Sequence, residues 1–160
     1  MLYDPRKKPR FESNSGAYVL WINIRRNVDM QIGKLAYLNF KVGAYLYTGS
    51  ALRLLQQRLV RHLKSDKIKR WHIDHLTSHP WCEIENIFIL FSLTKLECEL
   101  NQSILTNITA TVVMNGFGSS DCKNGCGGHL IWLPSAITPR ELYTFLQSQW
   151  GSAIDWIQLK

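Results

Sequence analysis

The sequence predicts an α+β fold in which a small central antiparallel mixed sheet is flanked by helices. Strand-like runs dominate the first third of the chain, an amphipathic helical pattern follows, and a continuous apolar run typical of a buried central strand comes next. Strands and helices therefore mix within one unit. The 160 residues suffice for one core and leave no room for a second full domain. We expect a flexible basic arm over residues 1–15 and a single domain over 16–160 that includes a C-terminal extension.

The N-terminal strands are predicted from composition and from the residues that bound them. Residues 18–24 are rich in β-formers and lie between Gly16 and a charged turn. Residues 30–40 are interrupted by Gly33 and predict a strand pair or hairpin arm, and aromatic residues alternate over 43–47. Together these segments predict an antiparallel meander.

The first helix is predicted where the apolar period changes to three and four residues. Ser50 is a suitable N-cap, and the pattern runs to about Lys64. On a helical wheel, three polar residues share the flank beside the apolar stripe. They are Arg58, Arg61 and His62.

The second half of the chain alternates between strands and helices. A short helical or turn segment at 71–76 precedes the buried strand 84–93. Thr94 and Glu97 have the spacing of a capping box for a helix over 95–105. The remaining expected elements are a strand at 112–115, a glycine-rich loop at 116–128, a strand at 129–133 and a helix at 141–150 capped by Thr138.

Charge and cysteine content indicate the kind of partner and compartment. Lysine and arginine total 19 against 12 acidic residues, a formal net charge of +7, which favours a polyanionic partner. An ordinary basic protein without such a partner has the same composition. The basic N-terminus has no apolar segment of a secretory signal behind it, and charged residues interrupt every apolar run. We expect a cytoplasmic protein with no membrane role, whose four cysteines are reduced or bind metal.

Several residues have the chemistry needed to cut a phosphodiester. The reaction needs an activated water, stabilisation of charge on the phosphoryl oxygens and neutralisation of the departing oxyanion. Tyrosine can relay a proton, arginine can hold a phosphate, and a glutamate-bound divalent metal can stabilise the leaving group. The chain places Tyr18, Tyr47, Arg58 and either Glu97 or Glu99 on successive expected elements.

At these residues the chain resembles the GIY-YIG nuclease superfamily. The Gly-Ala-Tyr motif at 16–18 and the Tyr-Thr-Gly motif at 47–49 are similar to its two signatures, and the next helix carries an arginine, Arg58. Further motifs are similar to a small branch of that superfamily, at residues 49–51, 61–62, 71–74, 97–98 and 116–122. The chain departs from the pattern in the 29-residue separation of Tyr18 and Tyr47, which requires an insertion or an extended meander between them.

The resemblance implies an endonuclease that uses one magnesium or manganese ion on a nucleic acid, with DNA the favoured substrate. It implies that Tyr18 or Tyr47 deprotonates water, that Arg58 holds the phosphate, and that Glu97, or else Glu99, binds the metal. His62 and Arg61 would assist, and Ser50, Arg53 and His72 would contact substrate. The asparagine that often follows the glutamate helix in the superfamily has no clear counterpart; Asp121 or His129 would have to take its place.

Each of these residues also has an ordinary structural interpretation. Tyr18 and Tyr47 could be core aromatics, as Tyr37 and Tyr45 are expected to be, and the arginines could be a solvated helix flank. His62 could activate water, contact phosphate or lie on the surface. His72 and Asp74 could orient a catalytic group or cap local structure.

A second group of residues has the composition of a zinc site. Cys122, Cys126 and His129 are close in sequence, and Cys98 on the preceding helix could complete a three-cysteine, one-histidine set. Four reduced, partly buried thiols are the alternative. The chain as a whole could accordingly be a non-catalytic nucleic-acid-binding module, or a zinc-stabilised interaction protein. Its oligomeric state is not encoded in any pattern.

Overall fold

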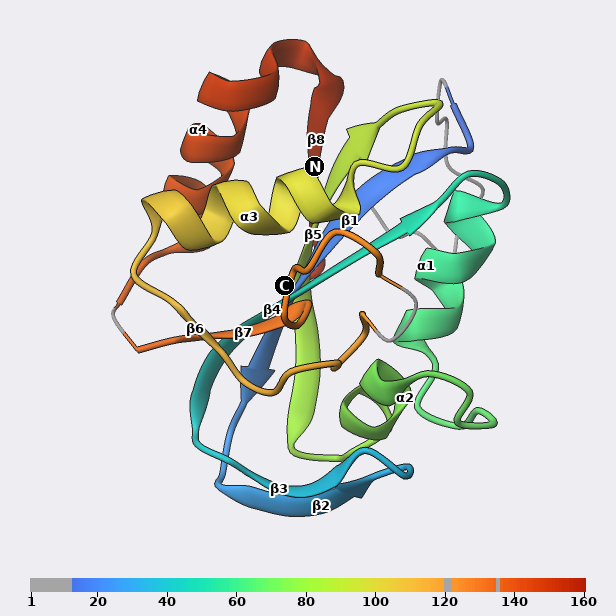
Figure 1. Ribbon diagram of the computed structural model, residues 1–160, viewed down its shortest axis with the longest axis vertical. Helices are drawn as coiled ribbons and strands as arrows, with labels where there is room; N and C mark the ends of the chain where they lie inside the picture. Colours follow the sequence, from blue (N-terminus) through green and yellow to red (C-terminus); the bar gives the residue numbers. More distant parts are fainter. Residues whose placement is uncertain (1–12, 120–121, 135) are drawn as a thin grey trace.

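The computed structural model describes residues 13–119, 122–134 and 136–160, and these form an α+β fold (Figure 1). Five pairings, all antiparallel, build the main sheet in the order β6-β7-β4-β1-β5-β8, and β2 and β3 form a separate two-stranded sheet. The strands are β1 (Gly16–Ile24), β2 (Val28–Ile32), β3 (Ala36–Phe40), β4 (Gly43–Ala51), β5 (Cys82–Phe91), β6 (Thr111–Val112), β7 (Leu130–Leu133) and β8 (Ile154–Gln158). The helices are α1 (Leu55–Leu63), α2 (His72–Thr77), α3 (Glu97–Asn107) and α4 (Pro139–Trp150), followed by a 3-10 turn at Gly151–Ala153.

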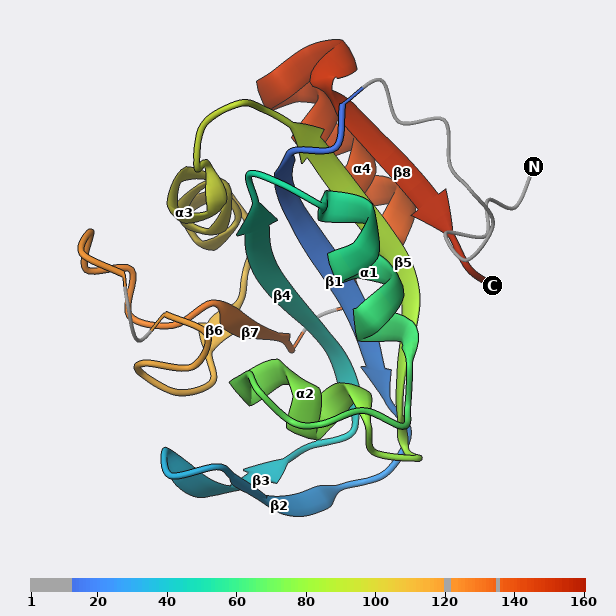
Figure 2. The same cartoon turned by 90° about the vertical axis from the view of Figure 1, so that its right-hand side faces the viewer.

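Both faces of the main sheet are buried, which explains why β1 and β5 are apolar almost throughout. Alternate residues of β1 point to opposite faces. Leu20 and Ile22 belong to a core shared with α1, α2 and the β2–β3 hairpin, whereas Val19 and Trp21 belong to a second core shared with α3 and α4. The two helix pairs accordingly lie on opposite sides of the sheet (Figure 2).

The segment between β1 and β4 is an inserted hairpin and not a part of the main sheet. β1 pairs directly with β4 along their whole lengths, from Gly16 opposite Ala51 to Ile24 opposite Gly43. The expected continuous meander is therefore wrong, and of the two arrangements considered for the long tyrosine spacing the insertion is the one found. Val28, Ile32 and Phe40 of the hairpin are buried against the core beneath α2, while Tyr37 is exposed.

Helix α1 begins four residues later than expected because β4 continues through the expected cap. Ser50 pairs with Ala17 as a strand residue, so its assignment as N-cap is wrong. The turn is made at Leu54, which adopts a left-handed conformation with φ 55°. Asn14 then caps the helix, its carbonyl and side-chain oxygens accepting hydrogen bonds from the amides of residues 55 and 56. Asn14 thus belongs to the folded domain, whereas residues 1–12 of the expected arm lie outside the described residues.

The predicted cap of α3 is wrong, whereas the predicted cap of α4 is confirmed. Thr94 does not cap α3, which begins at Glu97 after Leu96 with no side-chain cap. Thr138 does cap α4, in a reciprocal capping box with Glu141. The tail contains a strand, β8, that its sequence did not suggest; it covers the edge of β5. Within the part of the chain that is described, no helix is long and apolar enough to span a membrane.

Candidate active site

A cleft of about 350 Å³ lies at the end of the central strands, between α1 and the start of α3. It is lined by Tyr18 from β1, Tyr47 from β4, Arg58 from α1 and Glu97 from α3. These four residues are separated by up to 79 positions in the chain, since Glu97 follows Tyr18 by that number. The fold therefore brings together one candidate for each function that phosphodiester hydrolysis requires.

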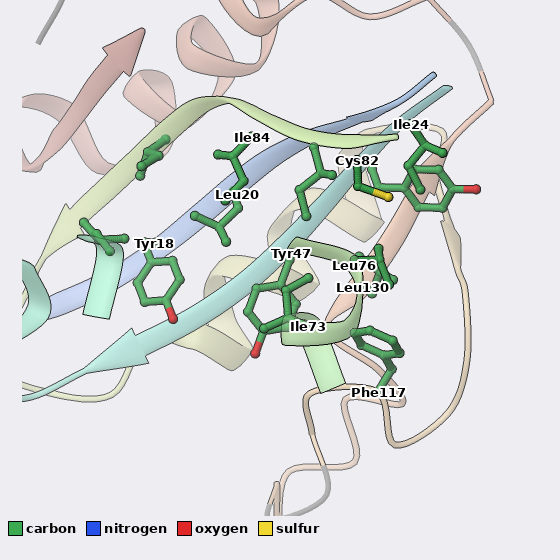
Figure 3. Packing of buried hydrophobic residues seen from close by; sticks show 14 of the residues in the cluster. Tyr18, Leu20, Ile24, Tyr47, Ile73, Leu76, Cys82, Ile84, Phe117 and Leu130 are labelled. Carbon is green, nitrogen blue, oxygen red and sulfur yellow. The ribbon is translucent and has the colours of Figure 1, made fainter. Parts of the chain in front are cut away.

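The two tyrosines lie on the same face of the sheet. Leu20 is paired with Tyr47, and Tyr18 lies two residues from Leu20, so both phenols leave the sheet in the same direction. Figure 3 shows their hydroxyl groups pointing the same way, with Phe117 beyond Tyr47. Both rings are almost completely buried, with 2% of Tyr18 and 8% of Tyr47 exposed. Only the small part of each phenol that lines the cleft can therefore contact a ligand.

The hydroxyl of Tyr18 is in contact with His62, whose Nε2 lies 2.7 Å away. Burial, and secondarily the neighbouring Tyr47, raise the pKa of Tyr18 well above its usual value, although Arg58 acts in the opposite direction. Burial and the charge of Lys67 lower the pKa of His62 to about 3, so the imidazole is neutral at pH 7. His62 is only 1% exposed. It is therefore not a surface histidine, and it contacts Tyr18 rather than the open cleft.

Arg58 is held at the cleft by its own strand-to-helix turn. Its Nη1 donates to the carbonyl of Ser50 at 2.6 Å, and its guanidinium lies 4.9 Å from the ring centroid of Trp71. Ser50 and Trp71 both line the cleft as well. Ser50 holds Arg58 through its backbone carbonyl and also lies at the cleft, where the resemblance places a contact with substrate.

The structure distinguishes the two candidate glutamates. Glu97, the first residue of α3, is partly buried and lines the cleft, whereas Glu99 is exposed and is not among the lining residues. Positions two apart on a helix are about 200° apart around its axis. Among the two, Glu97 alone is placed beside Tyr18, Tyr47 and Arg58.

Three residues expected to bind substrate lie elsewhere. Arg61 forms a bidentate salt bridge with buried Asp74: each carboxylate oxygen of Asp74 lies 2.8 Å from a guanidinium nitrogen of Arg61. His72 Nδ1 accepts a hydrogen bond from the backbone amide of Gly118 at 3.1 Å and so supports the glycine-rich loop. Arg53 is exposed and outside the lining of the cleft. The carboxylate of Asp74, in the first turn of α2, also accepts the amides of residues 70 and 71 and so supports the start of that helix, whose N-cap is Trp71.

Lys95 and Trp71 line the cleft but were not predicted as site residues from the sequence. Lys95 lies just before α3 and adds a cation to the cleft, and Trp71 supports Arg58. A lysine two residues before the candidate metal ligand Glu97 was the available signal for the first. Asp121, considered as a substitute for the missing asparagine, lies outside the described residues, whereas His129 does line the cleft.

Beside the cleft, four side chains form a group that could hold a metal ion. The ligand atoms of Cys98, Cys122, Cys126 and His129 all lie within 4.8 Å of one another. Cys122 Sγ is 3.3 Å from that of Cys98 and 3.4 Å from that of Cys126. The three thiols and one imidazole are thus gathered from α3, the glycine-rich loop and the residue before β7.

A larger cavity, of about 720 Å³, lies on the other side of His62. Arg25, Glu83 and Lys160 contribute its charges, and neither tyrosine signature reaches it. The candidate catalytic groups therefore line the smaller cleft and not the larger cavity.

The fold and the cleft define a small α+β domain with tyrosine, arginine and glutamate at one site and a cysteine–histidine group beside it. The chain belongs to the family described as Domain of unknown function DUF123, whose model matches residues 17–150. No curated protein and no solved structure matches the chain. The matched range contains every residue of the cleft and of the cysteine–histidine group.

Proposed function

We propose that this chain is a metal-dependent endonuclease of the GIY-YIG type that hydrolyses phosphodiester bonds of a nucleic acid, with DNA as the favoured substrate. The observation that carries the proposal is the meeting of Tyr18, Tyr47, Arg58 and Glu97 in one cleft. Their order in the sequence and their positions on strand, strand, helix and helix are those that the resemblance implies. The net charge of +7 suits a polyanionic substrate.

In the proposed mechanism, the attacking water loses its proton through one of the two tyrosines: the phenol oxygen accepts a hydrogen bond from the water and orients it, and the proton is released to solvent as the bond to phosphorus forms. In its Nδ1–H tautomer, neutral His62 accepts a hydrogen bond from the Tyr18 hydroxyl. Because the pKa of His62 is so low, the imidazole is a poor final acceptor for that proton. His62 therefore acts by orienting Tyr18, and it does not touch the phosphate.

Arg58 and Glu97 supply the remaining functions. A guanidinium has five N–H donors, more than the carbonyl of Ser50 uses, so the others can bind phosphoryl oxygens. The carboxylate of Glu97 is an oxygen ligand of the kind that magnesium and manganese prefer. An ion bound there would stabilise negative charge on the leaving oxygen. Lys95 would add a positive charge at the same side of the cleft.

As a further part of the proposal, we assign the Cys98, Cys122, Cys126 and His129 group to zinc. Three sulfurs and one imidazole nitrogen are ligands of structural zinc, and they suit magnesium poorly. We also propose that the protein acts in the cytoplasm, because a reducing compartment keeps cysteines as the thiols that bind metal.

The test is cleavage of end-labelled single-stranded, duplex and branched DNA, and of RNA, with magnesium or manganese added. Arg58→Ala and Glu97→Gln should abolish metal-dependent cleavage, whereas the matched control Glu99→Gln, two residues away on the exposed side of α3, should retain it. Unchanged cleavage in both Arg58→Ala and Glu97→Gln would refute the proposal. Circular dichroism establishes that each variant is folded.

The basic charge also favours a second candidate, a nucleic-acid-binding module without catalysis. It predicts that labelled nucleic acid stays full-length with either metal and shows a gel shift that weakens as salt rises. Metal-dependent shortening of the same probe excludes it. The choice between the two depends on whether Glu97 binds an ion.

A further inference from the structure

Two of the four residues in the cysteine–histidine group are directly connected to the cleft. Cys98 follows Glu97 in the first turn of α3, so a ligand bond at Cys98 restrains the helix end that carries the candidate carboxylate. His129 belongs to the group and also lines the cleft. The same four side chains therefore adjoin the cleft from two different elements.

His129 is fixed by its backbone to the strand that carries Tyr47. The amide of Thr48, the residue after Tyr47, donates to the carbonyl of His129 at 3.0 Å. The amide of His129 in turn donates to the carbonyl of Phe117 at 2.8 Å. A ligand bond at His129 consequently acts on β4 next to the second tyrosine.

The other two cysteines belong to the glycine-rich loop, which forms a wall of the cleft. Gly118 of this loop packs so closely on Tyr47 that a Cβ there would lie 2.6 Å from the ring. Among the described residues of the loop, two side-chain hydrogen bonds join it to α3 without any metal, from Asn101 to the Gly128 carbonyl at 3.0 Å and from Gln102 to the Cys126 carbonyl at 3.4 Å. Two such bonds are a weak restraint on a loop with this many glycines.

The separations of the sulfur atoms are close to those of a tetrahedral zinc site. Thiolates bound at about 2.3 Å in a tetrahedron lie about 3.8 Å apart. Cys98 Sγ lies 3.3 Å from Cys122 Sγ and 3.9 Å from His129 Nε2, and all four ligand atoms lie within 4.8 Å of one another, so shifts of up to about 1 Å complete the arrangement. The four ligands are thus already assembled by the fold.

We propose that a structural zinc ion at this group is a clamp that joins the start of α3 to the loop and to β4, and thereby sets the position of Glu97 relative to Tyr47. The first part concerns metal binding alone; the second part, the effect on Glu97, rests on the proposed function of that residue as a metal ligand. Cys98 and His129 act as positioning residues for the cleft and do not react with substrate.

The experiment compares Cys126→Ser and Cys122→Ser with Cys82→Ser, a matched control because Cys82 is a buried cysteine on β5 outside the group. The first measurement is zinc per chain by elemental analysis, with replacement by cobalt to observe thiolate charge-transfer and tetrahedral d–d absorption. We expect one zinc per chain in the wild type and in Cys82→Ser, and loss of it in the other two. Limited proteolysis should then cut the 116–128 loop faster in the two zinc-free variants.

The second measurement is manganese binding by electron paramagnetic resonance, which needs no catalytic activity. We expect loss of zinc to weaken manganese binding about tenfold or more, as removal of supporting interactions does in other metal sites, and Glu97→Gln to remove it while zinc stays bound. Wild-type protein stripped of zinc by a chelator and reloaded gives the same comparison if a serine variant does not fold.

The results separate the two proposals. Absence of zinc and cobalt from folded wild-type protein overturns the clamp, as does manganese binding that is unchanged when zinc is lost. If zinc and manganese behave as expected but no nucleic acid is cut, the clamp stands and the endonuclease proposal fails.

Discussion

Gly49 lies directly opposite Tyr18 in the β1–β4 ladder, and the phenol of Tyr18 occupies the space where a side chain at residue 49 would be. A Cβ on Gly49 would lie 2.5 Å from the Tyr18 hydroxyl oxygen and 2.6 Å from Cζ. The glycine of the second signature therefore leaves the space that the tyrosine ring of the first signature fills. The two motifs, 29 positions apart from tyrosine to tyrosine, form one steric unit.

Gly49→Ala should displace the Tyr18 ring, destabilise the protein by about 2 kcal/mol and abolish cleavage, because overpacking forces side chains off their rotamers. Chemical denaturation and the nuclease assay measure the two effects. Adding Tyr18→Leu removes the overlapping atoms, so the double variant should be at least about 1 kcal/mol more stable than the sum of the single changes predicts. Strict additivity would show that the contact with Tyr18 is not the cause.

Stability should fall as the medium is acidified, in part through His62. Its folded pKa of about 3 is below the ordinary value, so between pH 6.5 and 3 the unfolded chain binds a proton that the folded chain does not. The contribution is therefore complete above about pH 6.5 and falls by about 1.4 kcal/mol for each pH unit below it. The free energy of unfolding, measured with urea at several pH values between 6 and 4.5, should therefore fall less steeply with decreasing pH in His62→Gln, by this amount per pH unit. Equal slopes in the two proteins would contradict the burial of a neutral imidazole.

Asp74→Asn should destabilise the fold by about 3 kcal/mol, because it leaves the charges of Arg61 and Lys67 without their buried partner. Burial alone would raise the pKa of Asp74, but hydrogen bonds from Arg61 and from the amides of Trp71 and Arg70 outweigh it and hold the pKa at about 2.

The depressed pKa of Asp74 also determines the pH range of this effect. The carboxylate contributes stability above about pH 4, its unfolded value, and loses it as pH falls towards 2. The difference between wild type and Asp74→Asn should shrink over that range in thermal or denaturant unfolding. Arg53→Ala, at an exposed position, is the control and should change stability by less than about 0.5 kcal/mol.

Arg58→Lys should retain the positive charge but lower the cleavage rate about a hundredfold, since an ammonium cannot replace the fork of donors that binds both Ser50 and a phosphate. Single-turnover cleavage at saturating manganese measures the effect. The control is Arg53→Lys, which lies outside the cleft and should cleave at the wild-type rate. A fully active Arg58→Lys enzyme would limit the role of Arg58 to general charge neutralisation.

Local patterns were sufficient to predict most elements of this fold but not their ends. The apolar period predicted α1, and Thr138 followed by Pro139 predicted the cap of α4. The cap of α1 was predicted wrongly at Ser50 because the actual cap, Asn14, comes from a segment distant in sequence. β8 was missed because it is only five residues long and is fixed by pairing with the edge of β5, which no local pattern indicates.

Residue types and local spacing specified which kinds of chemistry are available: two tyrosines that each lie two residues from a glycine, an arginine on one helix, two early glutamates on another, and three cysteines with a histidine. Tertiary structure decided which of them meet. It placed Glu97 in the cleft and left Glu99 exposed, buried His62 against Tyr18, and paired Arg61 with Asp74. The physical reason is that direction around a helix, burial and ion pairing depend on contacts between elements far apart in the chain, whereas residue type and local spacing do not.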